Sequence, residues 1–70
     1  MVVDFVVRED CGNYVLSYIY NREYFLYEGH IEDKATGVTL GVQGNSRELL
    51  RTDAALADTI FQNRLLNIIQ

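Results

Sequence analysis

The chain has 70 residues, 49% of them hydrophobic and 23% charged, which suits one globular domain over residues 1–70 and is too short for two. Cys11 is its single cysteine, so an internal disulfide is excluded, and no apolar run reaches the roughly 20 residues of a membrane-spanning helix. The formal net charge is -4, without a basic run to hold a phosphate backbone. We therefore expect a cytoplasmic protein that binds neither membranes nor nucleic acid directly.

The first third of the chain predicts a β-hairpin. Val2 to Val7 is β-branched and aromatic with a two-residue period, which indicates a strand. The polar run Glu9 to Gly12 follows and is typical of a four-residue hairpin loop. A second strand is expected from Tyr14 to Tyr20.

Two further strands are expected in the middle of the chain. A two-residue turn at Asn21-Arg22 leads into a third strand from Tyr24 to Glu32. Asp33 to Gly37 has the composition of a turn, because Asp bonds nearby backbone amides and Gly accepts a positive φ. Val38 to Val42 is the predicted fourth strand.

A helix is predicted to begin after Gln43 to Ser46, where Asn45 and Glu48 have the spacing of a capping box. Asp53 lies within its apolar stripe and Thr52 could cap a fresh start, which leaves a kink or two successive helices open. Residues 64–70 are interpreted as helix, with a short fifth strand after Asn63 as the alternative. The stripe has helical spacing and consists of Leu49, Leu56 and Ile60, with Leu50, Ala57, Phe61 and Ile68 adjoining.

Together these elements predict an α+β fold, in which a four-stranded antiparallel meander sheet is followed by a C-terminal helix packed on one face (β-β-β-β-α). The predicted loops fix the pairing between strands, and all of them give one face that is apolar throughout. The helix should cover this face, with Tyr14, Tyr18 and Tyr27 in the core. The predicted pairs are Val7–Tyr14, Phe5–Leu16, Val3–Tyr18, Tyr18–Phe25, Leu16–Tyr27, Ile31–Leu40 and Gly29–Val42.

The opposite face of the predicted sheet is mixed, and one helix cannot cover both faces. It should therefore be exposed to solvent or covered by a partner. Its apolar end is expected to hold Val2, Ile19, Tyr24 and Leu26, and its acidic end Glu28, His30 and Glu32. The remaining members are Asp4, Val6, Arg8, Val15, Ser17 and Thr39.

Catalytic and metal-binding patterns are lacking in the sequence. Its one cysteine and one histidine, Cys11 and His30, are predicted in a loop and in mid-strand, which is a poor arrangement for a nucleophile and its base. Glu28, His30 and Glu32 form an acid-His-acid row, for which a solvated strand face is favoured over a cation site. Gly41 to Ser46 lacks the Lys-Ser/Thr of a phosphate-binding loop. We expect a non-enzymatic protein without metal or cofactor.

Acidic and tyrosine side chains are the candidate binding groups. Residues 1–33 hold seven acids and two bases, whereas residues 34–70 hold three acids and four bases. The acids are either ordinary solvated charges or a carboxylate array that replaces phosphates opposite Arg and Lys of a partner. Tyrosine combines a large contact area with a polar tip, which favours binding. The candidate partner-binding residues are Asp4, Glu9, Asp10, Ile19, Tyr20, Tyr24, Leu26, Glu28, His30, Glu32 and Asp33.

The sequence thus predicts a small acidic inhibitor or adaptor that binds a protein with a basic surface and blocks a nucleic-acid-binding site on it. The alternative is a homodimer formed through the apolar end of the mixed face. Sedimentation of the wild type and of Tyr24→Asp separates the two hypotheses.

Two resemblances bear on these hypotheses. The stretch from Val7 to Val15, VREDCGNYV, resembles the strand-turn-strand opening of HicB-type antitoxins, although the Pro-Gly-containing segment expected after it is missing. This resemblance implies a homodimerising, antitoxin-like module. In size, acidity and predicted layout, without a shared residue motif, the chain is also similar to small phage-encoded inhibitors such as anti-CRISPR proteins. That similarity implies an inhibitor of a protein partner.

Overall fold

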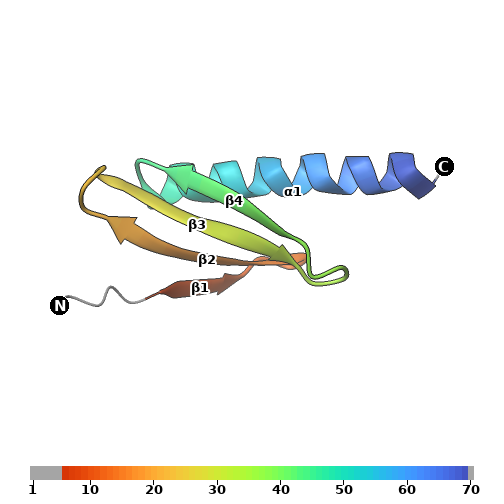
Figure 1. Cartoon of the computed structure of the whole chain (residues 1–70), viewed down its shortest axis with the longest axis horizontal. Coiled ribbons are helices and arrows are strands. Elements are labelled where there is room, and N and C mark those ends of the chain that lie inside the picture. Colours follow the sequence, from red (N-terminus) through yellow and green to blue (C-terminus); the bar gives the residue numbers. More distant parts are fainter. Residues whose placement is uncertain (1–5, 70) are drawn as a thin grey trace.

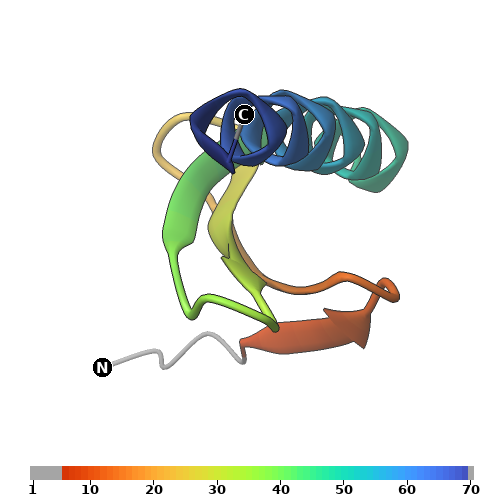
Figure 2. The same ribbon diagram turned by 90° about the vertical axis from the view of Figure 1, so that its right-hand side faces the viewer.

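The predicted α+β architecture is confirmed by the computed structural model, which describes residues 6–69. Four antiparallel strands form one sheet in the order β1-β2-β3-β4, and a single helix, α1, packs against it (Figure 1). Seen along its axis, α1 lies over one side of the curved sheet, closest to β4 and β3 (Figure 2). The elements are β1 Val7–Asp10, β2 Tyr14–Asn21, β3 Leu26–Asp33, β4 Thr39–Gly44 and α1 Arg47–Ile69.

The first hairpin is tighter than the sequence predicts. β1 continues through Asp10, so the predicted loop from Glu9 to Gly12 is wrong, and residues 11–13 make the connection. The cause is local, because Gly12 adopts a φ of +90° and donates its N–H to the Asp10 carboxylate at 3.0 Å. Val7 consequently pairs with Tyr18 instead of Tyr14. The earlier part of the predicted first strand, Val2 to Phe5, lies outside the described residues.

The second hairpin is wider than the predicted two-residue turn. Asn21 Oδ1 accepts the backbone N–H groups of Glu23 and Tyr24, at 3.0 and 3.4 Å, which supports a four-residue turn over residues 22–25. Tyr24 therefore lies in the turn and not in β3, and Phe25 closes the turn at a φ of +54°. The predicted pairs Leu16–Tyr27 and Tyr18–Phe25 are wrong.

Pairing between β2 and β3 is shifted by four residues, so that Leu16 faces Ile31 and Tyr18 faces Gly29. A shift by an even number leaves every side chain on its predicted face of the sheet. The third hairpin is confirmed as predicted, with Ile31 opposite Leu40 and Gly29 opposite Val42. β4 starts one residue later than expected and continues through Gly44.

The helix is one continuous element, which excludes both the second start at Thr52 and the fifth strand. Its cap is Ser46, and the predicted capping box of Asn45 and Glu48 is wrong. Ser46 Oγ accepts the N–H of Leu49 at 3.1 Å, and its carbonyl accepts that of Leu50 at 2.9 Å.

The face that α1 turns toward the sheet also differs from the predicted stripe. Leu50 and Ala54 are fully buried, and Ala57 packs beside them. Leu49, Leu56 and Ile60, the centre of the predicted stripe, are instead exposed. Small side chains at 54 and 57 let the helix approach the sheet closely, so packing distance rather than hydrophobicity decides which face is buried.

The core is confirmed to lie between the helix and the predicted apolar face of the sheet. Tyr14 and Tyr18 are buried as expected, and Tyr27 is half-buried against them. The Tyr18 and Tyr27 rings meet edge to face at 5.9 Å. The buried hydrophobic residues are Tyr14, Leu16, Tyr18, Ile31, Val42, Leu50 and Ala54.

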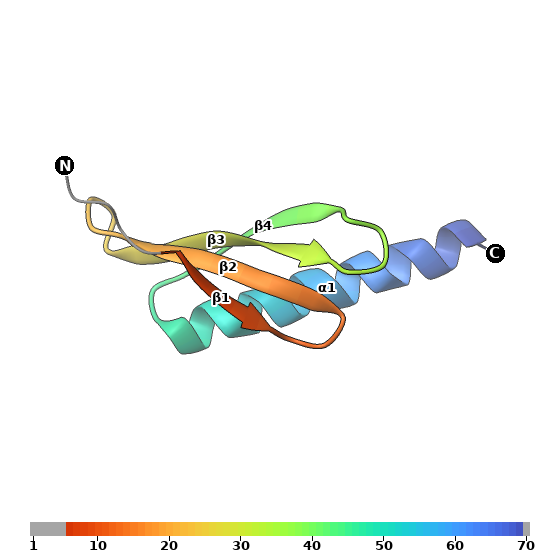
Figure 3. The same cartoon turned by 90° about the horizontal axis from the view of Figure 1, so that it is seen from below.

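The molecule is elongated because α1 extends past the end of the sheet (Figure 3). The radius of gyration is 13.1 Å, whereas a compact chain of this length would have about 11 Å. No helix in residues 6–69 has the length and apolar character needed to cross a membrane.

Candidate functional site: the open face of the sheet and its hairpin tip

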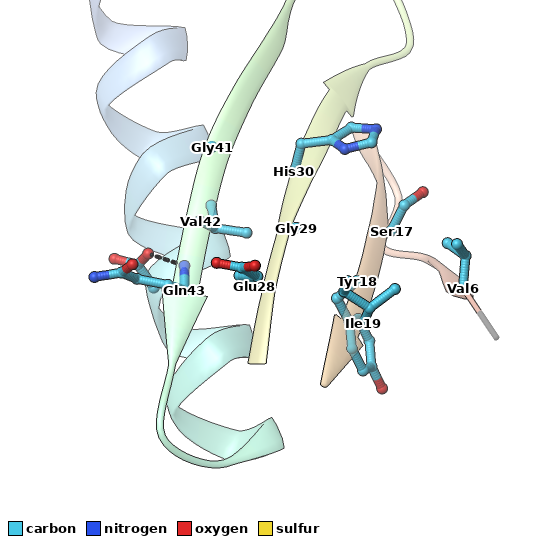
Figure 4. A pocket seen from close by; sticks show the side chains of 11 residues that line it. Val6, Ser17, Tyr18, Ile19, Glu28, Gly29, His30, Gly41, Val42 and Gln43 are labelled. Carbon is cyan, nitrogen blue, oxygen red and sulfur yellow. Dashed lines mark hydrogen bonds between the residues drawn. The ribbon is translucent and has the colours of Figure 1, made fainter. Parts of the chain in front are cut away.

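The sheet face turned away from α1 is called the open face here, and its side chains lie in rows across the strands. One row runs Arg8, Ser17, His30, Gly41, and the next runs Ile19, Glu28, Gln43. These rows contain the residues that sequence alternation assigns to this face. The cavity along them has a volume of about 750 Å³ and is widely open (Figure 4).

Two glycines line the cavity, Gly29 in the helix-side row of Tyr18 and Val42, and Gly41 in the open-face row of Ser17 and His30. Gly29 lies so close to β2 that an added Cβ would meet the Ser17 carbonyl oxygen and would stand 2.6 Å from the Tyr18 Cα. Without a side chain there, β2 and β3 approach each other closely. Gly41 has open space around it, so the centre of the face lacks a side chain on β4. The result is a hollow in which Ser17 is buried although no helix covers it.

Acidic side chains of the open face come from β3. Glu28 is half-buried and accepts a hydrogen bond from Asn21 Nδ2 at 2.9 Å, which orients its carboxylate without neutralising it. His30 and Glu32 are exposed, and Arg8 is exposed two strands away on the same face. The predicted acidic end is therefore assembled, with one arginine beside it.

Three of the predicted partner-binding acids bond within the fold instead. Asp33 is buried at the β3–β4 turn, where its carboxylate accepts bonds from Thr36 N and Oγ1 at 2.9 Å and from Gln62 Nε2 at 2.9 Å. Burial raises its pKa, but the hydrogen bonds from Thr36 and Gln62 outweigh burial and leave the pKa below 3.8. Asp33 thus links α1, through Gln62, to the β3–β4 turn.

The other two acids lie on β1. Arg51 donates two hydrogen bonds to the Glu9 carboxylate, from Nε at 3.0 Å and from Nη2 at 2.8 Å. The Tyr18 hydroxyl donates a third bond to the same carboxylate at 2.9 Å. These bonds, that of Arg51 first, hold the pKa of Glu9 below 4.5. Asp10 pairs with Lys34 at 2.7 Å, and this bond together with Gly12 N lowers its pKa below 3.8. The structure does not describe the placement of Asp4.

Acid should destabilise this fold through the same three carboxyl groups. Their folded pKa values lie below the ordinary values of 3.8 for Asp and 4.5 for Glu, so they contribute stability above those values and lose it as pH falls through the folded pKa. We expect the thermal midpoint to be level from pH 7 to 5 and to fall steeply below about pH 4. Asp33→Asn should flatten that fall. A midpoint that declines equally in the variant would contradict the assignment.

The β2–β3 hairpin tip presents aromatic side chains next to the open face. Tyr24 and Phe25 are 69% and 74% exposed, and Leu26 continues from them onto the open face. Tyr20, the other predicted interface tyrosine, is 38% exposed and lies on the helix side, where its ring meets Tyr27 at 4.9 Å. Ile19 is half-buried within the hollow.

Phe25 is the prominent exposed residue that the sequence interpretation omits. Its segment, EYFLY, reads as strand because every residue but one is aromatic or aliphatic. The available signal was Asn21, whose side chain can bond the backbone two and three residues later and so widen the turn. A four-residue turn places both Tyr24 and Phe25 at the tip.

Within residues 6–69, no group of three or more His, Cys, Asp and Glu side chains could hold a metal ion. Glu28, His30 and Glu32 share a face, but Glu28 is oriented by Asn21. The Cys11 thiol donates a long hydrogen bond of 3.7 Å to the Glu9 carbonyl in its own hairpin. Cys11 lies in the β1–β2 turn and His30 in the middle of β3, the separate positions that the sequence predicts.

Comparisons with known proteins add no assignment to this geometry. A scan of family models found no match, and searches of curated proteins and of solved structures found none either. The resemblance of Val7 to Val15 to HicB-type antitoxins therefore depends on those residues alone.

Proposed function

We propose that the protein is a non-enzymatic inhibitor or adaptor that binds another protein through the hairpin tip and the adjoining open face. The observation that carries this proposal is the conformation of Phe25. A non-glycine residue at a φ of +54° costs about 1 kcal/mol or more, and this one is 74% exposed, so the fold receives little packing in return. A large aromatic side chain in that position is better explained by a contact outside the molecule.

The charges next to the tip favour a partner with a basic surface. Within residues 6–69, Glu28 and Glu32 lie on the open face without an ion pair, whereas Glu9 and Asp10 are paired with Arg51 and Lys34. The array of carboxylates available to a partner therefore contains fewer acids than the sequence predicts, because Glu9 and Asp10 are already paired. It is suited to one or two Lys or Arg side chains flanking a groove that receives Tyr24 and Phe25, such as the edge of a nucleic-acid-binding site.

The predicted alternative is a homodimer through Val2, Ile19, Tyr24 and Leu26, of which Val2 lies outside the described residues. Tyr24 lies in the turn instead of beside Ile19 on a strand, and Ile19 is sunk in the hollow. Exposed aromatic side chains at a protruding tip are better suited to enter a groove than to form a flat, self-complementary patch.

Phe25→Gly tests the proposal because it separates folding from binding. Glycine accepts a positive φ, so we expect the free energy of unfolding to stay level or rise by up to about 1 kcal/mol. Capture of the partner from a lysate of the native cell should nevertheless fall at least tenfold by quantitative mass spectrometry. Leu66→Ala, which trims an exposed side chain at the far end of α1, is the control and should capture normally. Equal capture by Phe25→Gly would refute the role of the tip.

A second comparison tests the charge of the partner with two substitutions that change the charge of the protein by the same amount. Glu32→Lys lies on the open face and Glu48→Lys on the helix, and both side chains are exposed. With a basic partner, Glu32→Lys should weaken binding about tenfold at low salt and less at 0.5 M salt, where screening is strong. Glu48→Lys should change affinity by less than about twofold. Equal effects would argue against a basic partner.

A further inference from the structure

The second apolar stripe on α1 is not explained by the core. Leu49, Leu56 and Ile60 are 53–58% exposed, and their spacings of seven and four residues place them on one side of the helix. Asp53 lies between Leu49 and Leu56, and Arg64 follows Ile60 by four residues. These five residues are called the lateral stripe below. Leu at one seam position and Ile at the next is the pattern of helix-to-helix packing.

The lateral stripe faces outward next to the β4 edge of the sheet. Asp53 Oδ2 accepts the backbone N–H of Gln43 in β4 at 3.0 Å, whereas Arg51 reaches the opposite edge of the sheet at Glu9. Leu50 and Ala54, which point into the core, lie between these two directions. The Asp53 side of α1 therefore overhangs β4, and Leu56 and Ile60 continue along that side.

The β4 edge below this stripe has backbone groups that point away from β3. Asp33 N bonds to the Val38 carbonyl, and in an antiparallel ladder this pattern repeats every second residue. The backbone N–H and C=O of Thr39, Gly41 and Gln43 thus point outward, and Asp53 caps the N–H of Gln43. Another strand paired along this edge would replace Asp53 as the acceptor of the Gln43 N–H and release the Asp53 carboxylate.

One two-fold axis would pair both elements with those of a second copy. β4 and α1 run in opposite directions (Figure 1), and Gln43 of β4 lies beside Asp53 of α1. Gly41 is two residues before Gln43 in β4, a distance of about 6.6 Å along the strand. The same distance along the helix corresponds to about four or five residues after Asp53. Gly41 is then level with the midpoint between Leu56 and Ile60. Rotation about an axis there sets Leu56 against Ile60 of the second copy and β4 against β4.

The spacing between the two helices fits this arrangement as well. Paired strands lie about 4.8 Å apart, and α1 packs on β4 and β3, which places its axis a few ångströms inward from the edge. Two copies would then hold their helix axes about 10 Å apart, within the usual range for packed helices.

Charge complementarity supports the same register. Asp53 lies one turn before Leu56, and Arg64 lies one turn after Ile60. When Leu56 faces Ile60 of the other copy, Asp53 comes opposite the turn that holds Arg64, and the reciprocal pair forms by symmetry. Arg64 is exposed and belongs to neither ion pair described within residues 6–69, Arg51–Glu9 and Lys34–Asp10.

We infer that the lateral stripe and the β4 edge bind a second copy of this chain, giving an antiparallel, two-fold dimer with a continuous eight-stranded sheet. This surface excludes the hairpin tip and meets the open face only along the β4 edge, at Gly41, Gln43 and Asp53, so it does not depend on the proposed function. Both open faces lie on the same side of the joined sheet, and the two hairpin tips lie at opposite ends.

Mixing of charge variants tests the dimer directly. At chain concentrations on the order of 100 µM, where a micromolar interface is populated, sedimentation velocity should show a wild-type dimer. Asp53→Arg and Arg64→Asp should each be at least tenfold weaker, because each places like charges opposite each other. An equimolar mixture should restore the dimer, since the two introduced charges then face each other across the axis and the native Asp53 of one chain faces the native Arg64 of the other.

Asp53→Arg also removes the hydrogen bond between Asp53 and Gln43 N, so two further helix variants test the dimer without changing Asp53. Ile60→Asp puts a charge in the stripe, and Thr59→Asp puts the same charge on the neighbouring exposed position outside it. The first should be monomeric and the second dimeric, with circular dichroism confirming that both are folded. A monomeric wild type, or a dimer that survives Ile60→Asp, would overturn the inference.

Discussion

Gly29→Ala should remove a large part of the stability of this fold. The new Cβ would overlap the Ser17 carbonyl oxygen and lie 2.6 Å from the Tyr18 Cα, and both atoms are backbone, which cannot rotate away. β2 and β3 would have to separate at the middle of the sheet. We expect a loss of about 3 kcal/mol or more, against a total of roughly 4–10 kcal/mol for a domain of 70 residues.

Gly41→Ala provides the matched control, because Gly41 lies one strand away, on β4, opposite the residue that follows Gly29. Its Cβ would meet no atom within 4 Å, so stability should stay level or rise by up to about 1 kcal/mol as the unfolded chain loses freedom. Urea unfolding of both variants gives the comparison. Similar losses in the two would show that the close approach of β2 to β3 is not the feature that requires glycine at 29.

Leu50→Ala should have the second large effect because this side chain joins the helix to the sheet. Leu50 is fully buried among core residues, and truncation of such a leucine costs about 2–5 kcal/mol, depending on how far the cavity collapses. In so small a core we expect a thermal midpoint lowered by more than about 10 °C, since 1 kcal/mol shifts it by about 4–8 °C at this size.

An exposed leucine on the same helix checks this assignment of the buried face. Leu66 is 58% exposed, and Leu66→Ala should change stability by no more than about 0.5 kcal/mol. The pair is informative because the two substitutions remove the same atoms from the same helix and differ in burial. If Leu66→Ala were the more damaging substitution, α1 would be rotated relative to the sheet.

Side-chain alternation predicted the faces of the sheet, whereas turn lengths could not be predicted from composition. The third hairpin followed from Asp33 and Gly37, which provide a cap and a positive φ at the expected places. In the second hairpin, the Asn21 side chain accepts the backbone N–H groups of Glu23 and Tyr24, which widens the turn. Both errors in pairing were even, so Ile19, Glu28 and His30 still reached the predicted face.

The helix face and the candidate site show where hydrophobicity is an insufficient guide. α1 carries two apolar stripes, and the sheet selects the one that contains Ala54, because small residues allow close packing. Among the acids, Asp33 and Glu9 are drawn into the fold by Gln62 and Arg51, partners 29 and 42 residues away. Such distant pairings leave no periodic signal in the sequence.

The order of the elements has a consequence for partial unfolding of the chain. All four strands precede α1 and pair only with one another, so the helix can detach from the sheet without breaking a strand pair. Detachment of Leu50 and Ala54 leaves the sheet face that carries Leu16, Ile31 and Val42 as an apolar surface open to other chains. Opening of α1 should therefore be the step that starts aggregation of this protein.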